Sequence, residues 1–151
     1  MTHIRPATPT DVSAITACVH SAFQPYVERI GRPPAPMLED NTHVIATRSV
    51  FVAEKDALVV GVLVLATTDE GFLLENVAVS PRHRGHAVGR ILLEFAEVEA
   101  RRRGHRSVYL SNHERRTEAR GLYARVGYGK FDRRTENGHA RVFLRKMLPA
   151  E

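Results

Sequence analysis

The chain has 151 residues, 43% of them hydrophobic and 26% charged, which is typical of a globular protein and excludes a disordered or fibrous one. Its net charge of +5 is uneven, because residues 1–80 hold 5 basic and 9 acidic side chains, whereas residues 81–151 hold 17 and 8. Cys18 is the single cysteine, so an internal disulfide is excluded, and the longest apolar run is too short to span a membrane. We expect one domain over residues 1–151, without a signal peptide, in the cytoplasm.

The first half of the chain begins with a short strand candidate over residues 3–7. A helix is predicted over residues 8–23, because Thr8 can cap it, Pro9 suits the first turn and Asp11 completes a capping-box start. The prolines of residues 31–37 exclude a helix there, and a short helix is expected from about Pro36 to Thr47. Three strands follow over residues 49–55, 57–68 and 72–79, the first two joined by a turn containing Asp56.

From Ala87 the apolar pattern becomes helical and continues to Gly104, with one face formed by Val88, Ile91, Leu92, Phe95 and Val98. A strand over residues 106–112 comes next. Thr117 can cap a further helix, which Gly127 ends, and residues 129–148 are predicted to form a closing hairpin.

This order of elements predicts the fold class. Three consecutive strands with short connections favour antiparallel pairing, whereas the strand–helix–strand unit from residue 75 to residue 111 requires a parallel pair. We therefore expect an α/β protein with a central mixed sheet of six or seven strands and helices on both faces.

The stretch VAVSPRHRGHAVGRILL, residues 77–93, places charge and small residues where a strand turns into a helix. A helix N-terminus presents unpaired N–H groups and binds anions, and small residues let a ligand approach the backbone. Gly85, Ala87 and Gly89 are small, and Arg82, Arg84 and Arg90 are cationic. The stretch therefore indicates a pyrophosphate site, although a tight turn with solvated arginines remains an alternative. It has neither the Rossmann spacing nor a P-loop lysine.

These residues resemble motif A of the GNAT superfamily of N-acetyltransferases, in which a V-x-V-x-P strand end precedes [RQ]-x-x-G-x-[GA] and an amphipathic helix. Here the core of the motif reads Arg84, Gly85, His86, Ala87, Val88 and Gly89. Ala87 stands where the family usually has its first glycine. Because an alanine methyl group is small and the N–H group is kept, we expect the anion site to persist with less room.

A second segment, ARGLYARVGY, is similar to the family's A-x-x-L-Y-x-x-x-G-[FY] pattern and matches it at Ala119, Leu122, Tyr123, Gly127 and Tyr128. The family often has an asparagine three residues before that alanine, where this chain has Arg116. The resemblance covers nearly the whole chain and implies a GNAT-like fold.

The resemblance implies acetyl-CoA as co-substrate and no metal. The backbone of Val77, Ala78 and Val79 would pair with the pantetheine arm, and the N–H of Val79 would face the thioester carbonyl. Backbone N–H groups from Arg84 to Arg90 would hold the pyrophosphate, and the cleft would open between the strands that end at Val79 and Asn112. The residues expected to bind the cofactor are Val77, Ala78, Val79, Arg84, Gly85, His86, Ala87, Val88, Gly89, Arg90 and Asn112.

Two residues are candidates for catalysis. Tyr123 matches the family tyrosine that protonates the departing thiolate, a step that a lowered phenol pKa would favour. Its alternative role is core packing on its helix. Glu75 is expected to share the face of Val77 and Val79, because alternate strand residues point to one side, and to act as general base or amine-binding anion. A solvent-open edge position is its alternative.

The acceptor is expected to be a primary amine of a small molecule, amino acid or peptide. Tyr26, Arg29, Arg32 and Met37 lie on the segment that covers the acceptor side in this fold, and two arginines suit a carboxylate. The eight histidines have no zinc-type spacing. Low aromatic content makes nucleic acid an unfavoured partner, and no membrane contact is expected, while a homodimer is compatible with the chain.

We therefore interpret the chain as a bacterial, acetyl-CoA-dependent N-acetyltransferase that acts by direct attack in a ternary complex. The alternative is a non-catalytic module that binds acyl-CoA or nucleic acid on the same fold. Nucleic-acid binding that weakens steeply with salt would favour the alternative.

Overall fold

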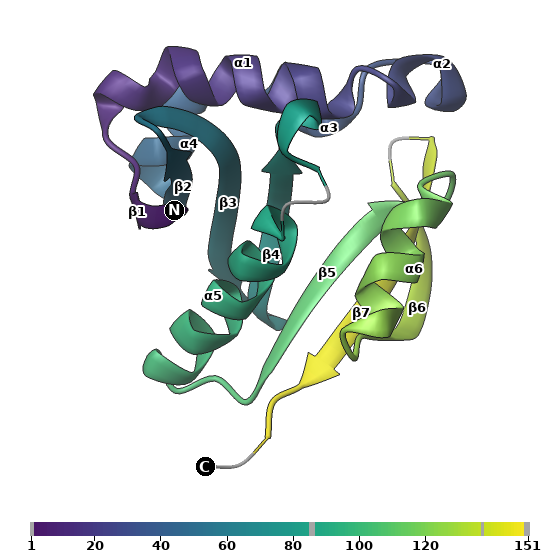
Figure 1. The fold of residues 1–151 in the computed structure, drawn as a ribbon. Helices are drawn as coiled ribbons and strands as arrows, with labels where there is room; N and C mark the ends of the chain where they lie inside the picture. The colour runs from purple at the N-terminus through teal and green to yellow at the C-terminus, as the bar shows by residue number, and fades with distance from the viewer. Residues whose placement is uncertain (1, 85–86, 137, 150–151) are drawn as a thin grey trace.

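The computed structural model describes residues 2–84, 87–136 and 138–149. Within them, seven strands form one mixed sheet in the order β1-β2-β3-β4-β5-β7-β6 (Figure 1). This confirms the predicted fold class, including the closing hairpin and the parallel pair between β4 and β5. The strands are β1 (His3–Pro6), β2 (Ser49–Lys55), β3 (Leu58–Thr68), β4 (Gly71–Val79), β5 (Ser107–His113), β6 (Gly129–Glu136) and β7 (His139–Met147).

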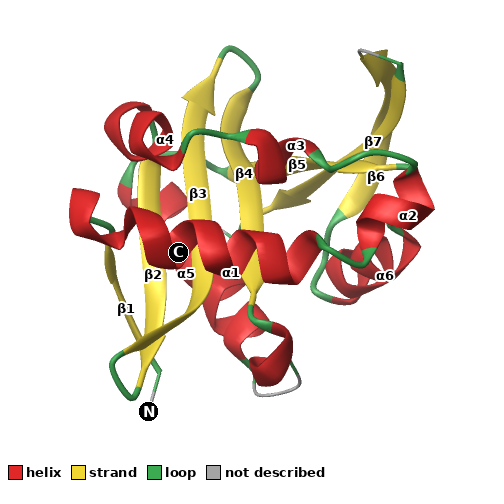
Figure 2. Ribbon diagram, turned by 90° about the horizontal axis from the view of Figure 1, so that it is seen from above, coloured by secondary structure: helices red, strands yellow, loops and turns green. Residues whose placement is uncertain are grey.

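Helices cover both faces of the sheet (Figure 2). On one face, α1 and α4 pack against a core cluster that includes Val52, Val62 and Ala78. On the other, α5 and α6 share a cluster with Leu63, Phe72 and Leu74. None of the described helices is long and apolar enough to cross a membrane. The helical elements are the 3₁₀ turns η1 (Pro9–Asp11) and η2 (Pro81–His83) and the α-helices α1 (Val12–Phe23), α2 (Tyr26–Ile30), α3 (Ala35–Leu38), α4 (Asn41–Thr47), α5 (Val88–Arg102) and α6 (Thr117–Arg125).

The N-terminal helix begins as its sequence predicts, with a 3₁₀ turn as its first part. Thr8 and Asp11 form the capping box, and the Thr8 N–H donates to the Asp11 carboxylate at 2.7 Å. The single helix expected over residues 36–47 is wrong, because the chain forms α3 and α4 instead. Asp40 separates them, and its carboxylate accepts the N–H of Thr42 at 3.0 Å as the cap of α4.

The apolar face of α5 differs in part from the prediction. Val88 and Leu92 are buried, but Val98 is 56% exposed, because the buried side continues through Ala96, Glu99 and Ala100. Glu99 is neutralised there by Arg102 and Arg103 at 2.8 and 3.1 Å. A Cβ atom at Gly61 of β3 would lie 2.9 Å from Leu92 Cδ1, so glycine lets α5 approach the sheet closely.

An irregularity in β4 changes which way its side chains point. Asn76 pairs with Val64 of β3 and Leu74 pairs with Leu65, so Glu75 has no partner residue on β3. Such a β-bulge shifts the alternation by one residue. Phe72 and Leu74 therefore face the same core cluster as Val77 and Val79.

The parallel pair of β4 and β5 is short. Leu73 and Tyr109 are the paired residues, and beyond them the two strands diverge toward the N-terminus of α5 (Figure 1). This divergence positions the site.

Candidate functional site

A large cleft lies beside the N-terminus of α5. It has a volume of about 710 Å³ and is lined from α1, α2, β4, α5 and α6. Val77, Ala78 and Val79 line it, together with Arg84 and the run from Ala87 to Arg90. Most of the residues predicted to bind the cofactor are thus brought to one cleft, whereas Gly85 and His86 lie outside the described residues.

The first turn of α5 offers unpaired N–H groups to this cleft. Ala87 precedes the helix in a left-handed conformation (φ 65°), and no side chain caps the turn. The N–H groups of the first turn have no partner within a helix, so they are available to an anion. A Cβ at Gly89 would have only an ordinary contact of 3.8 Å with Val79, so the space in front of this residue is open to a ligand.

Arg84, which lines the cleft, is held in place against α1. Its guanidinium donates to the carbonyl oxygen of Ala22 in α1 at 2.8 Å. This bond fixes the loop after β4 against α1 and leaves a cation beside the N-terminus of α5.

One backbone edge of β4 is open along the cleft. Val77, Ala78 and Val79 pair with Leu63, Val62 and Gly61 of β3. On the side of β5, the described pairing of β4 stops at Leu73. An extended ligand chain can therefore pair with this edge as an added strand.

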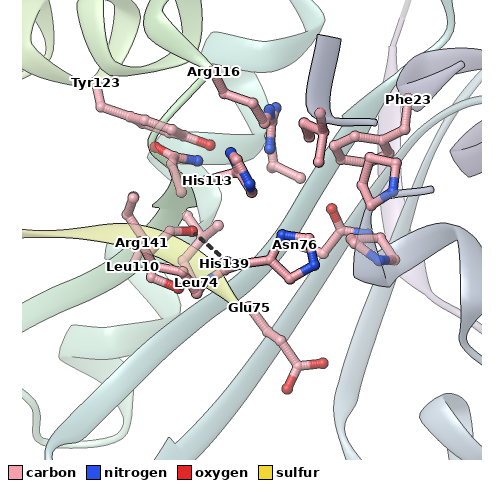
Figure 3. Close-up of a pocket in the computed structure, with 16 residues that line it drawn as sticks. Phe23, Leu74, Glu75, Asn76, Leu110, His113, Arg116, Tyr123, His139 and Arg141 are labelled. Carbon is pink, nitrogen blue, oxygen red and sulfur yellow. Dashed lines mark hydrogen bonds between the residues drawn. The ribbon is translucent and has the colours of Figure 1, made fainter. Parts of the chain in front are cut away.

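A small cavity of about 70 Å³ meets the large cleft. Phe23, Val77, Arg116 and Tyr123 line both. The rest of the small cavity includes Glu75, Asn112, His113, His139 and Arg141, from β4, β5 and β7 (Figure 3). Asn112, which was predicted to bind the cofactor, lines this cavity and not the large cleft.

Tyr123 lies where the two spaces meet. It is buried and contacts Tyr128 edge-on, with 5.7 Å between ring centroids. Burial raises the pKa of its phenol, while the guanidinium of Arg116 acts in the opposite direction. The phenol pKa is therefore raised, not lowered as would favour proton donation. The phenol stays protonated up to high pH.

Arg116 has a larger part in the site than its motif position indicates. Its guanidinium stacks on the rings of Phe23 and Tyr26, at 4.7 and 4.9 Å from the centroids. Its Nε is buried without a hydrogen-bond partner. Arg116 thus joins α6 to α1 and keeps a cation at the junction of cleft and cavity.

Two histidines face each other in the small cavity. The rings of His113 and His139 are 5.0 Å apart in an edge-on arrangement. Burial lowers the pKa of both, helped by Arg141, so both imidazoles are neutral near pH 7. Nδ1 of His113 accepts the N–H of Arg115 at 3.1 Å, which leaves its Nε2 as a donor.

The side chain of Glu75 points in a different direction from the one predicted. Its carboxylate pairs with Nε of Arg48 at 3.2 Å, at the end of α4. The expected common face with Val77 and Val79 is wrong, because the bulge at Glu75 breaks the alternation of β4. In Figure 3 the carboxylate points away from the rings of His113 and His139, although Glu75 contributes to the cavity wall.

The four residues predicted to bind the acceptor lie in different places, and only two of them line the large cleft. Tyr26 and Arg29 line the large cleft. Arg32 reaches Gly138, where a Cβ would lie 3.1 Å from its Nη2, and Met37 packs against the core cluster of α1. Arg32 and Met37 line neither the large cleft nor the small cavity.

Arg141, His113 and His139 line the small cavity but were not predicted as site residues from the sequence. In the structure His113 is directly opposite Arg141 across β5 and β7, and Nε of Arg141 donates to Oγ of Ser111 at 3.1 Å. The missing signal was the pairing of β7 with β5, which brings residues about 30 positions apart into contact.

A family model for the acetyltransferase (GNAT) domain matches residues 46–130, more than half of the chain. The chain belongs to the GNAT acetyltransferase family. The match includes β4, α5 and α6, which build the large cleft. A comparison with curated proteins finds no match.

Solved structures of this family have the same fold. The PaiA N-acetyltransferase from Thermoplasma acidophilum, in complex with coenzyme A, is 15% identical with a TM-score of 0.81 over 97% of this chain and 99% of that one. The ribosomal-protein-S18-alanine N-acetyltransferase from Escherichia coli is 17% identical, with a TM-score of 0.79 over 100% and 96%. A GNAT family acetyltransferase from Elizabethkingia anophelis with acetyl-CoA bound is 19% identical, with a TM-score of 0.71 over 97% and 98%.

Proposed function

We propose that this GNAT protein is an acetyl-CoA-dependent N-acetyltransferase that transfers the acetyl group to a primary amine by direct attack in a ternary complex. One observation carries the proposal. The large cleft, with its uncapped helix N-terminus, meets a second, polar cavity at Tyr123. Donor and acceptor can therefore lie on opposite sides of one buried hydroxyl.

The residues of the large cleft fit acetyl-CoA. The N–H groups at the start of α5 and the cations of Arg84 and Arg90 would hold the pyrophosphate. The open edge of β4 from Val77 to Val79 would pair with the pantetheine amides. When bound, the co-substrate supplies the thioester that the amine attacks. The other cofactor residues of this proposal are Gly85, His86 and Ala87, of which the first two lie outside the described residues.

Tyr123 would donate the proton that the leaving sulfur needs. Its raised pKa keeps the phenol protonated at every physiological pH, and Arg116 stabilises the phenolate that donation leaves behind. The N–H of Val79, on the open edge, would donate to the carbonyl oxygen on which negative charge develops.

The general base would lie in the small cavity. His139 is neutral near pH 7 and so can accept a proton from the attacking amine. Glu75, the base expected from the sequence, is the second candidate because it is part of the same cavity wall, but Arg48 holds its carboxylate. We place the reaction in the cytoplasm of a bacterium, and a homodimer stays a prediction.

Replacing Tyr123 by Phe tests the acid role. We expect kcat to fall by about 100-fold or more while the Kd for acetyl-CoA stays within about twofold, because only the proton donor is removed. Thiol release under saturating acetyl-CoA measures the first quantity, and calorimetry measures the second. Tyr109→Phe, in β5 outside both cavities, is the control. An unchanged kcat would contradict the acid role.

The pH profile of kcat distinguishes His139 from Glu75. A base acts only when deprotonated, and the pKa of His139 is lowered from 6.5, so we expect kcat to fall as the pH drops through a value below 6.5. In His139→Gln this acidic limb should vanish and kcat should fall by about 100-fold. Glu75→Gln should keep the limb. Loss of the limb in Glu75→Gln, and its retention in His139→Gln, would assign the base to Glu75 instead.

A further inference from the structure

The small cavity is lined by two guanidinium groups, and the carboxylate in its wall, that of Glu75, is paired with Arg48. Arg116 and Arg141 both line it, and among the described residues neither forms an ion pair with a carboxylate. Arg141 donates instead to neutral oxygens of Ser111, at 3.1 and 3.3 Å, and Glu136 attracts it without pairing. Two partly buried guanidiniums repel each other, so an anion between them is strongly favoured.

The cavity wall also presents one further hydrogen-bond donor and one acceptor without a partner. Nε2 of His113 is left as a hydrogen-bond donor, because Nδ1 accepts the N–H of Arg115. It therefore suits the same anion as the two arginines. Asn112 is only 3% exposed, and its Oδ1 has no hydrogen-bond partner. A buried acceptor oxygen is costly unless a donor reaches it, and an amine of the ligand is such a donor.

The size of the cavity limits what these groups can hold. Its volume is about 70 Å³, and a water position takes roughly 10–15 Å³ by this measure, so it holds about five to seven non-hydrogen atoms. An α-amino group, its α-carbon and the adjacent carboxylate together number about five. A polyamine would add cations to the two guanidinium groups, which disfavours it as the occupant of this cavity.

Building on the proposed function, we propose that the acceptor is a free α-amino acid. Its carboxylate would be bound by Arg141, Arg116 and Nε2 of His113, and its amine would donate to Oδ1 of Asn112 beside Tyr123. A peptide N-terminus lacks a carboxylate next to its amine and would be a poor acceptor. The carboxylate-binding arginines predicted from the sequence, Arg29 and Arg32, are thus replaced by Arg116 and Arg141.

Paired acceptors test this assignment. We would measure kcat/KM for thiol release with each of the twenty common amino acids, with their α-amides and with spermidine, all at saturating acetyl-CoA. We expect at least one amino acid to be acetylated about 100-fold more efficiently than its own amide, because the amide lacks the charge that the arginines bind.

The Arg141→Gln variant provides a second test of the proposed carboxylate site. It should reduce the preference for the acid over its amide by about 10-fold or more, mainly through KM, and leave the Kd for acetyl-CoA unchanged. Arg133→Gln, an exposed residue of β6 outside the cavity, is the matched control and should keep the preference.

The outcomes separate this inference from the proposed function. Acetylation of amides or spermidine with no transfer to any amino acid would overturn the inference and leave the N-acetyltransferase assignment standing. The same holds if acetyl-CoA binds but no amino acid is acetylated. Failure to bind acetyl-CoA at all would overturn both. An acid preference that survives in Arg141→Gln would exclude this residue as the carboxylate ligand.

Discussion

Ala87 has a left-handed backbone (φ 65°) at the position where the N-terminus of α5 turns toward the cleft. A residue with a Cβ atom pays about 1–2 kcal/mol for this conformation, whereas glycine adopts it freely but loses about 0.5–1 kcal/mol more entropy on folding. We expect Ala87→Gly to raise the free energy of unfolding by up to about 1 kcal/mol and to keep acetyl-CoA binding. Thermal denaturation with Ala124→Gly, a helical position of ordinary conformation, as control measures the difference. A destabilised Ala87→Gly protein would contradict this account.

At the scale of single residues, most positions predicted for the cofactor line one cleft, whereas Arg32 and Met37, predicted for the acceptor, line neither space. Val79, Gly89 and Tyr123 each lie within a short motif, so local patterns were enough to predict that they line the cleft. Arg141 lies opposite His113 because β7 pairs with β5, and strand pairing between distant segments leaves no local pattern.

At the scale of elements, one side chain joins β1, η1 and β2. The guanidinium of Arg5 donates to both oxygens of Asp11 at 2.8 Å and to Glu54 at 2.8 Å. The pKa of the buried Asp11 is held far below its ordinary value by this pairing with Arg5, and the N–H of Thr8 adds to the effect. A carboxylate with a lowered pKa stabilises the fold above its unfolded pKa, about 3.9, and this contribution is lost as the pH falls toward the folded value.

We therefore expect Asp11→Asn to lower the free energy of unfolding by about 1–3 kcal/mol at pH 7. The difference from wild type should shrink once the pH falls below about 4, because the wild-type carboxylate then becomes protonated on unfolding. Urea denaturation between pH 3 and pH 7 measures it, with the exposed Asp69→Asn as control. A difference that is the same at pH 3 and pH 7 would show that the ion pair is not its source.

The elements themselves followed from the sequence except where packing overrode the local pattern. The capping box of Thr8 and Asp11 and the closing hairpin were predicted correctly. The bulge at Glu75 was not, because strand alternation is assumed to continue unless a glycine or proline marks a break. This single inserted residue reversed the direction expected for the Glu75 carboxylate.

At the scale of the whole molecule, the sheet opens where β4 and β5 diverge, and the more basic half of the chain begins just there. The end of α1 forms part of one wall, and Arg84, Arg90, Arg116 and Arg141 bring cations to the cleft and the small cavity. Part of the excess of 17 basic over 8 acidic residues after residue 80 would thus serve the anionic co-substrate and the proposed anionic acceptor group.

The proposal that the N-terminus of α5 holds the pyrophosphate of acetyl-CoA can be tested by calorimetric titration of acetyl-CoA near physiological salt. Gly89→Glu places a carboxylate in front of the unpaired N–H groups, whereas Gly89→Ala adds only a methyl group with an ordinary 3.8 Å contact to Val79. We expect saturable binding by the wild type and by Gly89→Ala, and at least a 100-fold weaker Kd for Gly89→Glu. Equal binding by all three proteins, or none by the wild type, would contradict the claim.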